Sequence, residues 1–169
     1  MVSVFAVISV SMLGKAGDYT SKAYRGCIEA GALVNNLSNS SFELLTVHGC
    51  DYGDGAFLGV GLGLTSDFRS FYMVPLFGEI RYSFQLPGSL LPFASLRVGG
   101  ELLADTSEIT GGAFLFAPGV GLGLGPVNIR LGYRLDAGNF SSSELYPGRG
   151  YADYKLKLSS FEFGIALNF

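Results

Sequence analysis

The sequence is poor in charge, cysteine, histidine and tryptophan, and most of these shortages exclude a class of protein. Asp, Glu, Lys and Arg make up 15% of the 169 residues, against roughly 25% in soluble domains. The 11 basic residues are scattered along a chain of net charge −3, which excludes the basic surface of a nucleic-acid-binding protein. Two cysteines, Cys27 and Cys50, make neither a disulfide framework nor a CxxC motif.

Long apolar runs are also missing. No stretch reaches the roughly 18 consecutive apolar residues of a membrane-spanning helix, although hydrophobic residues make up 49% of the chain and the mean hydropathy is +0.38. The 25 glycines follow no collagen-like period. A chain that is too apolar for water and lacks spanning helices is best explained as a β-protein that meets lipid, and its length allows one domain.

The amino-terminal segment has the pattern of an export signal. Residues 2–13 form an apolar run of signal-peptide length, followed by small and polar residues. No Lys or Arg precedes this run, because the first basic residue is Lys15. We predict that residues 1–16 are the remnant of a signal peptide and that residues 17–169 form one domain. A first buried strand is the alternative for residues 2–13.

Alternation of apolar and polar residues dominates the chain from Tyr24 onward, in segments of about ten residues separated by Gly, Asn, Asp, Ser and Pro. It predicts eight β-strands, at 23–34, 41–50, 56–65, 73–86, 92–104, 112–124, 127–138 and 154–169. Short turns at 51–55, 87–91 and 125–126 alternate with longer loops at 35–40, 66–72, 105–111 and 139–153. The predicted fold is all-β, an eight-stranded antiparallel up-and-down transmembrane β-barrel with both termini on the short-turn side.

The two faces of each predicted strand carry different residue types. In the segment 73–86, Leu76 and Ile80 lie on one face, and Glu79 and Arg81 lie on the other. Such alternation fits a soluble lipocalin, whose apolar face points inward, and a membrane barrel, whose apolar face points outward. Glycines on the non-apolar face of two strands favour the membrane barrel, because they leave room for Arg and Glu in a narrow lumen.

Arginines and carboxylates share the inward face in equal number. Isolated charges in a narrow interior would be costly, so we predict matched ion pairs that fill a closed, charge-balanced lumen. Arginine suits this role because its planar fork can bond two carboxylates at once. The predicted members are Arg25, Glu29, Glu79, Arg81, Arg97, Glu101, Arg130, Arg134, Asp136 and Glu162.

Short motifs in a consistent order give the chain a family resemblance over residues 22–169. They are Tyr24-Arg25-Gly26, Glu29-Ala30-Gly31, Thr46-Val47-His48-Gly49, Gly59-Val60-Gly61-Leu62-Gly63, Val74-Pro75-Leu76-Phe77, Arg81-Tyr82, Pro92-Phe93, Pro118-Gly119-Val120-Gly121 and Leu131-Gly132-Tyr133. The chain resembles the small outer-membrane β-barrel proteins of Gram-negative bacteria, typified by OmpX and the OmpA membrane domain, and more closely their Bacteroidota version. The resemblance implies an outer-membrane β-barrel domain over residues 17–169, a location in the bacterial outer membrane and no catalytic residues.

No catalytic, cofactor-binding or metal-binding residue is predicted, and we do not expect an enzyme. The single histidine, His48, has Thr46 on the same face, and Cys27 could lie across the first hairpin. His48 is three residues before the turn at Asp51, near the periplasmic end, so we predict a structural histidine that donates to a neighbour in the lumen rather than a catalytic base. A disulfide between Cys27 and Cys50 stays open, because the strand register is not fixed.

The predicted function is a structural or surface-interaction role. The alternatives are a narrow porin-like transport pore and a soluble lipocalin-like carrier of a small ligand. The predicted partners are outer-membrane lipid, lipopolysaccharide and the barrel-assembly machinery, with no cofactor, no nucleic acid and a monomeric state.

Two segments are candidates for contacts with other molecules. Tyr146, Arg149 and Tyr151 belong to the longest loop and are of types enriched at recognition hot spots; an extension of the last strand is the alternative for this region. The chain ends in an alternating apolar series that resembles the assembly signal of outer-membrane barrels. Its members are Ile165, Leu167 and Phe169. The alternative for Phe169 is a residue of the aromatic girdle at the membrane interface.

Overall fold

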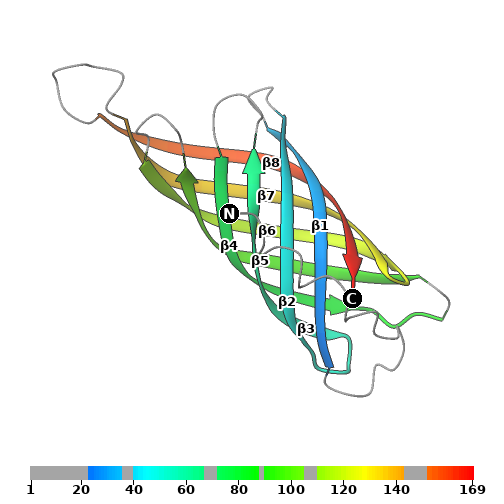
Figure 1. Ribbon diagram of the computed structural model, residues 1–169. Helices are drawn as coiled ribbons and strands as arrows, with labels where there is room; N and C mark the ends of the chain where they lie inside the picture. Colours follow the sequence, from blue (N-terminus) through cyan, green and yellow to red (C-terminus); the bar gives the residue numbers. More distant parts are fainter. Residues whose placement is uncertain (1–22, 36–39, 67–71, 88–89, 105–109, 143–151) are drawn as a thin grey trace, which may run out of the picture.

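The chain folds into a closed barrel of antiparallel strands, in which each strand pairs with the next and the last pairs with the first (Figure 1). The computed structural model describes residues 23–35, 40–66, 72–87, 90–104, 110–142 and 152–169. The strands are β1 (Ala23–Asn35), β2 (Ser40–Asp51), β3 (Ala56–Ser66), β4 (Tyr72–Ser83), β5 (Leu91–Ala104), β6 (Thr110–Leu124), β7 (Val127–Ser142) and β8 (Ala152–Asn168). The eight-stranded barrel predicted from the sequence is confirmed. Among these residues no helix is long and apolar enough to cross a membrane.

Strand ends differ from the prediction where alternation is a poor guide. β7 runs to Ser142 instead of residue 138, and β8 begins at Ala152 instead of residue 154, because the two strands continue to pair as far as Ser142 and Ala152. Main-chain pairing needs no apolar alternation, so this extension left no signal in the sequence. β4 ends at Ser83 rather than at residue 86.

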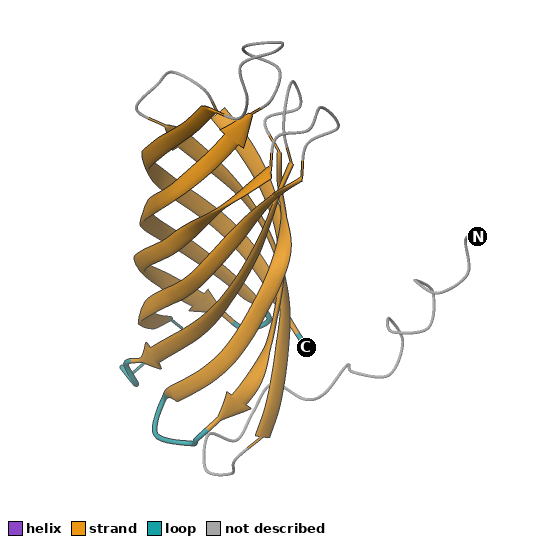
Figure 2. Cartoon of the chain, turned by 90° about the vertical axis from the view of Figure 1, so that its left-hand side faces the viewer, coloured by secondary structure: helices purple, strands orange, loops and turns teal. Residues whose placement is uncertain are grey.

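The described connections lie at one end of the barrel, together with Phe169 (Figure 2). The turn from β2 to β3 uses two glycines with positive φ, Gly53 (96°) and Gly55 (85°), and the Gly53 amide donates to Asp51 Oδ1 at 2.9 Å. The turn from β6 to β7 is Gly125-Pro126, with φ of 64° at Gly125. Residues that tolerate positive φ therefore close the tightest turns.

The outer surface carries many exposed large apolar side chains. Val60, Leu76, Leu102 and Phe161 are each at least 64% exposed. Exposed aromatic side chains lie toward both ends of the strands: at the short-turn end these include Tyr24, Tyr52, Tyr82 and Phe84, and at the opposite end Phe42, Tyr72 and Phe114. An apolar band with aromatic residues at both rims is the pattern of a barrel surrounded by lipid.

Candidate functional site

Arg97 on β5 is the centre of the charged interior. Its guanidinium donates to Glu79 Oε2 (2.9 Å), to both oxygens of Glu29 (3.1 and 2.6 Å) and to Glu162 Oε1 (2.8 Å). The side chains of all four residues are at most 2% exposed. Strands β1, β4, β5 and β8 are thus linked across the lumen through one planar cation, as the fork geometry of arginine allows.

Two further arginines extend this cluster along the lumen. Arg81 donates from Nε to Glu79 Oε1 at 2.9 Å and its Nη2 lies 2.5 Å from the same oxygen. Arg130 forms an ion pair with Glu162, and it also donates to Ser95 Oγ (3.0 Å) and to the Ala117 carbonyl (2.9 Å). Glu79 and Glu162 therefore each contact a second arginine.

A second cluster surrounds Arg134 on β7. Its guanidinium donates to Glu43 Oε2 at 2.9 Å and to Asp136 Oδ1 at 3.1 Å, and it pairs with Glu101. Glu43 on β2 was not among the predicted lumen residues. Its position could have been found by parity, because Glu43 shares a face of β2 with inward Leu45 and Val47, but that face mixes apolar and polar residues and gave no clear sign of a charged lumen.

The predicted balance between acids and arginines is wrong. The ion pairs between described residues join seven carboxylates to five arginines. Glu43 and Asp51 are the two unpredicted acids, and Asp51 pairs with Arg25 at 3.2 Å beside the β2–β3 turn. All ten predicted lumen residues take part in these pairs, so the surplus comes from Glu43 and Asp51, which were not assigned to the lumen from the sequence.

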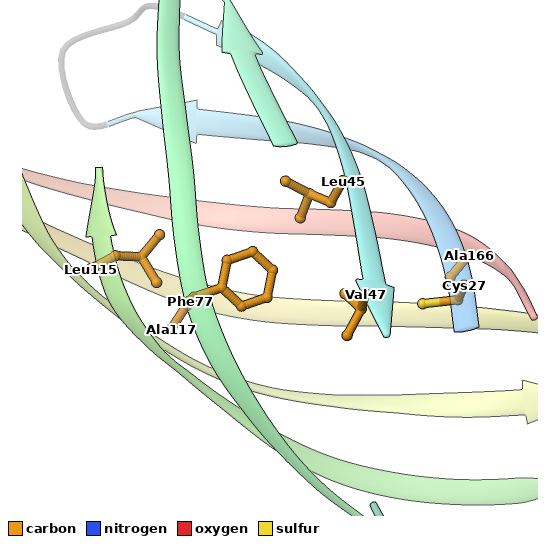
Figure 3. Close-up of a cluster of buried hydrophobic side chains, with 7 residues drawn as sticks. All are labelled: Cys27, Leu45, Val47, Phe77, Leu115, Ala117 and Ala166. Atoms are coloured by element: carbon orange, nitrogen blue, oxygen red, sulfur yellow. The ribbon is translucent and has the colours of Figure 1, made fainter. Parts of the chain in front are cut away.

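The interior also contains an apolar cluster, which the sequence did not predict. Its members come from five strands and point into the space that the barrel encloses: Cys27, Leu45, Val47, Phe77, Leu115, Ala117 and Ala166 (Figure 3). Phe57 packs against it. Phe57 lies on the same strand face as Gly59, and Phe77 on the same face as Glu79, so alternation alone could have placed both rings inside.

Phenylalanine rings, more than ion pairs, occupy the space left by the glycines of β3. A Cβ on Gly59 would lie 2.7 Å from Cζ of Phe57, and a Cβ on Gly61 would overlap the Phe77 ring. Arginine guanidinium groups lie over these rings. The Arg81 guanidinium is 5.3 Å from the Phe57 centroid, and the Arg97 guanidinium is 5.2 Å from the Phe77 centroid. Cation–π contact therefore joins the apolar and charged parts of the interior.

His48 points away from the lumen, so the predicted lumenal contact is wrong. His48 stands opposite Gly26 on β1 and Val60 on β3, on the outward face of the barrel. Hydrogen bonds join its Nδ1 to Tyr24 Oη (2.5 Å) and its Nε2 to Thr46 Oγ1 (2.8 Å). Both ring nitrogens are satisfied by neighbours on the same face, which makes an outward histidine tolerable beside exposed aliphatic residues.

The two cysteines lie on opposite faces. Cys27 is buried inside the barrel and Cys50 is exposed outside, and both are free thiols. In the pairing of β1 with β2, Cys27 stands opposite Val47 and Cys50 opposite Tyr24. The register therefore separates them, and it also separates Cys27 from the outward His48.

Phe169 completes the seam between β1 and β8. Its amide donates to the Gly26 carbonyl at 2.9 Å, and the Gly26 amide donates to the Phe169 carbonyl at 3.0 Å. The ring lies over Gly26, where a Cβ would be 2.9 Å from Phe169 Cζ, and edge-on to His48 at 6.1 Å between centroids. Ile165 and Leu167 point outward on the same strand.

The candidate contact residues Tyr146, Arg149 and Tyr151, like residues 1–22, lie outside the described part of the chain.

Comparisons with known proteins identify the fold. No family model matches the chain, and no curated protein matches it. Among solved structures, the chain is similar to Neisserial surface protein A, with 14% identity, a TM-score of 0.53, and coverage of 88% of this chain and 99% of that protein. It is similar to the outer membrane enzyme PagL, with 14% identity, a TM-score of 0.53, and coverage of 83% and 98%. At this identity the likeness extends to the closed β-barrel fold alone.

Proposed function

We propose that this protein is an integral bacterial outer-membrane β-barrel with a closed lumen, and that it has a structural or surface-interaction role rather than a channel or enzymatic one. The observation that carries the proposal is the contrast between its two faces. Exposed side chains such as Leu62, Leu122 and Ile165 are apolar, whereas Arg97, Arg130 and Glu79 are buried inside. A soluble carrier needs the reverse arrangement, so lipid and lipopolysaccharide are the proposed surroundings.

The filled interior supports the closed lumen. Arg97 and Arg130 are each 2% exposed and Glu79 is 0% exposed, whereas side chains that line a water-filled pore are hydrated. Leu45, Val47 and Phe77 occupy further interior volume. Eight-stranded barrels have an interior just wide enough for side chains. These features favour a sealed barrel over the narrow-pore alternative.

Purified protein should show no stable ohmic conductance in planar lipid bilayers, because ion pairs and apolar side chains occupy the path of an ion. The measurement is single-channel current at several voltages, with an open porin added afterwards to the same bilayer as a control for detection. Sustained, reproducible open steps from the purified barrel would contradict the closed lumen.

We also propose that Phe169 contributes to assembly. An unclosed barrel exposes the edges of β1 and β8, and Phe169 pairs with Gly26 at that seam. Alternating apolar side chains before it would set the register of pairing with an assembly partner. The alternative is a girdle residue, which would affect the final stability of the barrel rather than its insertion.

Phe169→Ala should lower the amount of folded barrel in the outer-membrane fraction of cells much more than it lowers the unfolding midpoint of barrel refolded in detergent. Folded protein is measured by its shifted mobility in mild SDS before heating. Leu122→Ala, an exposed outward residue of β6 away from the β1–β8 seam, is the matched control and should change neither quantity much. A large loss of stability without a loss of insertion would favour the girdle, and absence of the wild type from the outer-membrane fraction would contradict the proposed location.

A further inference from the structure

Three buried carboxylates converge where the two arginine clusters meet. Glu29 of β1, Glu43 of β2 and Glu162 of β8 each offer an oxygen, and these oxygens lie within 4.8 Å of one another. The three residues are 1%, 4% and 3% exposed. Like charges this close and this far from water repel strongly, so the arrangement needs positive charge between them.

The arginines do not supply that charge to every oxygen. Arg97 bonds both oxygens of Glu29 and Oε1 of Glu162, and Arg134 bonds Oε2 of Glu43. Glu43 Oε1 and Glu162 Oε2 are buried and accept no hydrogen bond. Buried carboxylate oxygens without a donor are costly, and each one calls for a ligand or a proton.

A fourth oxygen of a different kind lies beside the cluster. Thr65 of β3 stands directly opposite Glu43 in the strand register, and it is 2% exposed. Its Oγ1 is also buried without a hydrogen-bond partner. Directly opposed side chains on one face of a sheet have Cβ atoms about 5 Å apart, so the Thr65 hydroxyl is within reach of whatever Glu43 Oε1 binds.

Inward glycines hold the three acids in place. A Cβ on Gly31 would lie 2.8 Å from Glu43 Oε1, one on Gly132 would lie 3.1 Å from Glu162 Oε2, and one on Gly164 would lie 3.0 Å from the Glu29 carboxylate carbon. Each carboxylate therefore lies in a space that any larger residue would fill. The backbone of β1, β7 and β8 confines the three acids to one part of the lumen despite their repulsion.

The numbers of carboxylates and arginines inside the barrel indicate how much positive charge a bound ion would have to supply. Seven carboxylates pair with five arginines among the described residues, which leaves an excess of two negative charges. One divalent cation balances that excess. The candidate ligands are carboxylate and hydroxyl oxygens, without a thiol or an imidazole among them. Hard cations prefer such oxygen ligands.

We propose that Glu29, Glu43, Glu162 and the Thr65 hydroxyl bind one hard divalent cation of the Ca²⁺ type inside the barrel. Ca²⁺ suits the site better than Mg²⁺, because it accepts irregular oxygen geometry and carboxylates in either binding mode. The ion would neutralise the unbonded oxygens and link the neighbouring strands β8, β1, β2 and β3 from inside the lumen.

The test is metal content and stability after refolding in detergent, once with Ca²⁺ and once with chelator. We expect about one Ca²⁺ per chain by elemental analysis after removal of free ion, and a higher unfolding midpoint than in chelator. Glu43→Gln should lower the bound Ca²⁺ at least about tenfold at equal free ion, because ligand charge sets affinity. Glu101→Gln is the matched control: it removes another buried carboxylate that pairs with Arg134 but is not one of the three converging acids, and it should keep the ion.

Two outcomes would overturn the proposal. One is a wild-type barrel without bound Ca²⁺ that shows an infrared band of a protonated carboxylic acid, lost in Glu43→Gln, because protons then neutralise the cluster. The other is Ca²⁺ content that Glu43→Gln and Glu101→Gln lower equally, because the ion is then held by net charge alone. If Glu43→Gln fails to refold, Thr65→Val tests the same site without removing charge, and unchanged Ca²⁺ affinity in that variant would remove Thr65 from it.

Discussion

Arg97→Leu should destabilise the barrel by about 3 to 5 kcal/mol, the cost of removing one partner from a buried ion pair. Arg97 is the single arginine that pairs with Glu29 among the described residues, whereas Glu79 keeps Arg81 and Glu162 keeps Arg130. The substitution therefore leaves Glu29 without an arginine partner in an interior position. The measurement is equilibrium unfolding in urea of barrel refolded into lipid vesicles.

Two further variants separate this effect from simple loss of volume. Adding Glu29→Gln to Arg97→Leu should restore part of the lost stability, because the unpaired charge is removed with little change in shape. Arg81→Leu should cost less than Arg97→Leu, since among the described residues Arg81 pairs with one carboxylate, and Glu79 keeps its bond to Arg97. Equal losses in Arg97→Leu with and without Glu29→Gln would show that packing, rather than charge, explains the result.

Leu131→Arg should cost about 2 to 4 kcal/mol, the penalty of a cation on the lipid face near the membrane midplane. Leu131 is 57% exposed on β7, and its cross-strand neighbours on that face are Val120 and Phe163, which are also exposed. The same unfolding measurement in vesicles applies.

Leu124→Arg is the matched control for this position. Leu124 is an exposed leucine at the end of β6, next to the turn at Gly125. There the new cation can reach the headgroups, so the cost should fall to about 0 to 1 kcal/mol. Equal penalties at Leu124 and Leu131 would contradict a membrane boundary between them.

The sequence predicted the barrel because most strands follow one simple rule. In β4 and β5, charged residues such as Glu79, Arg81 and Arg97 alternate with apolar ones, and the structure keeps these two sets on opposite faces. Alternation needs only the two-residue period of an extended chain. Strand number, order and approximate ends were therefore accessible without tertiary contacts.

β2 shows where that rule fails. It places Leu45 and Val47 inside and Thr46 and His48 outside, the reverse of the polarity expected. The apolar residues pack with Phe77 in the lumen, and the polar ones satisfy each other through hydrogen bonds outside. Such compensation depends on partners from other strands, so composition along one strand could not reveal it.

The three converging acids could not be predicted for the same reason, because their positions depend on contacts between different strands. Most of the predicted lumen charges came from strands with clean alternation, and Glu43 was missed because its strand has none. The convergence of Glu29, Glu43 and Glu162 arises from the register that aligns β1 with β2 and β8. Register is a property of paired strands and not of one strand.

The most direct measurement of which face meets lipid uses the absence of tryptophan from the sequence. Single tryptophans replace the outward residues Leu62 and Leu131 and the inward residues Phe77 and Phe93, and fluorescence is recorded in vesicles whose acyl chains carry bromine, a short-range quencher. Leu62→Trp and Leu131→Trp should be strongly quenched, and Phe77→Trp and Phe93→Trp should keep their emission. Strong quenching of the inward pair with protection of the outward pair would contradict a lipid-facing apolar surface.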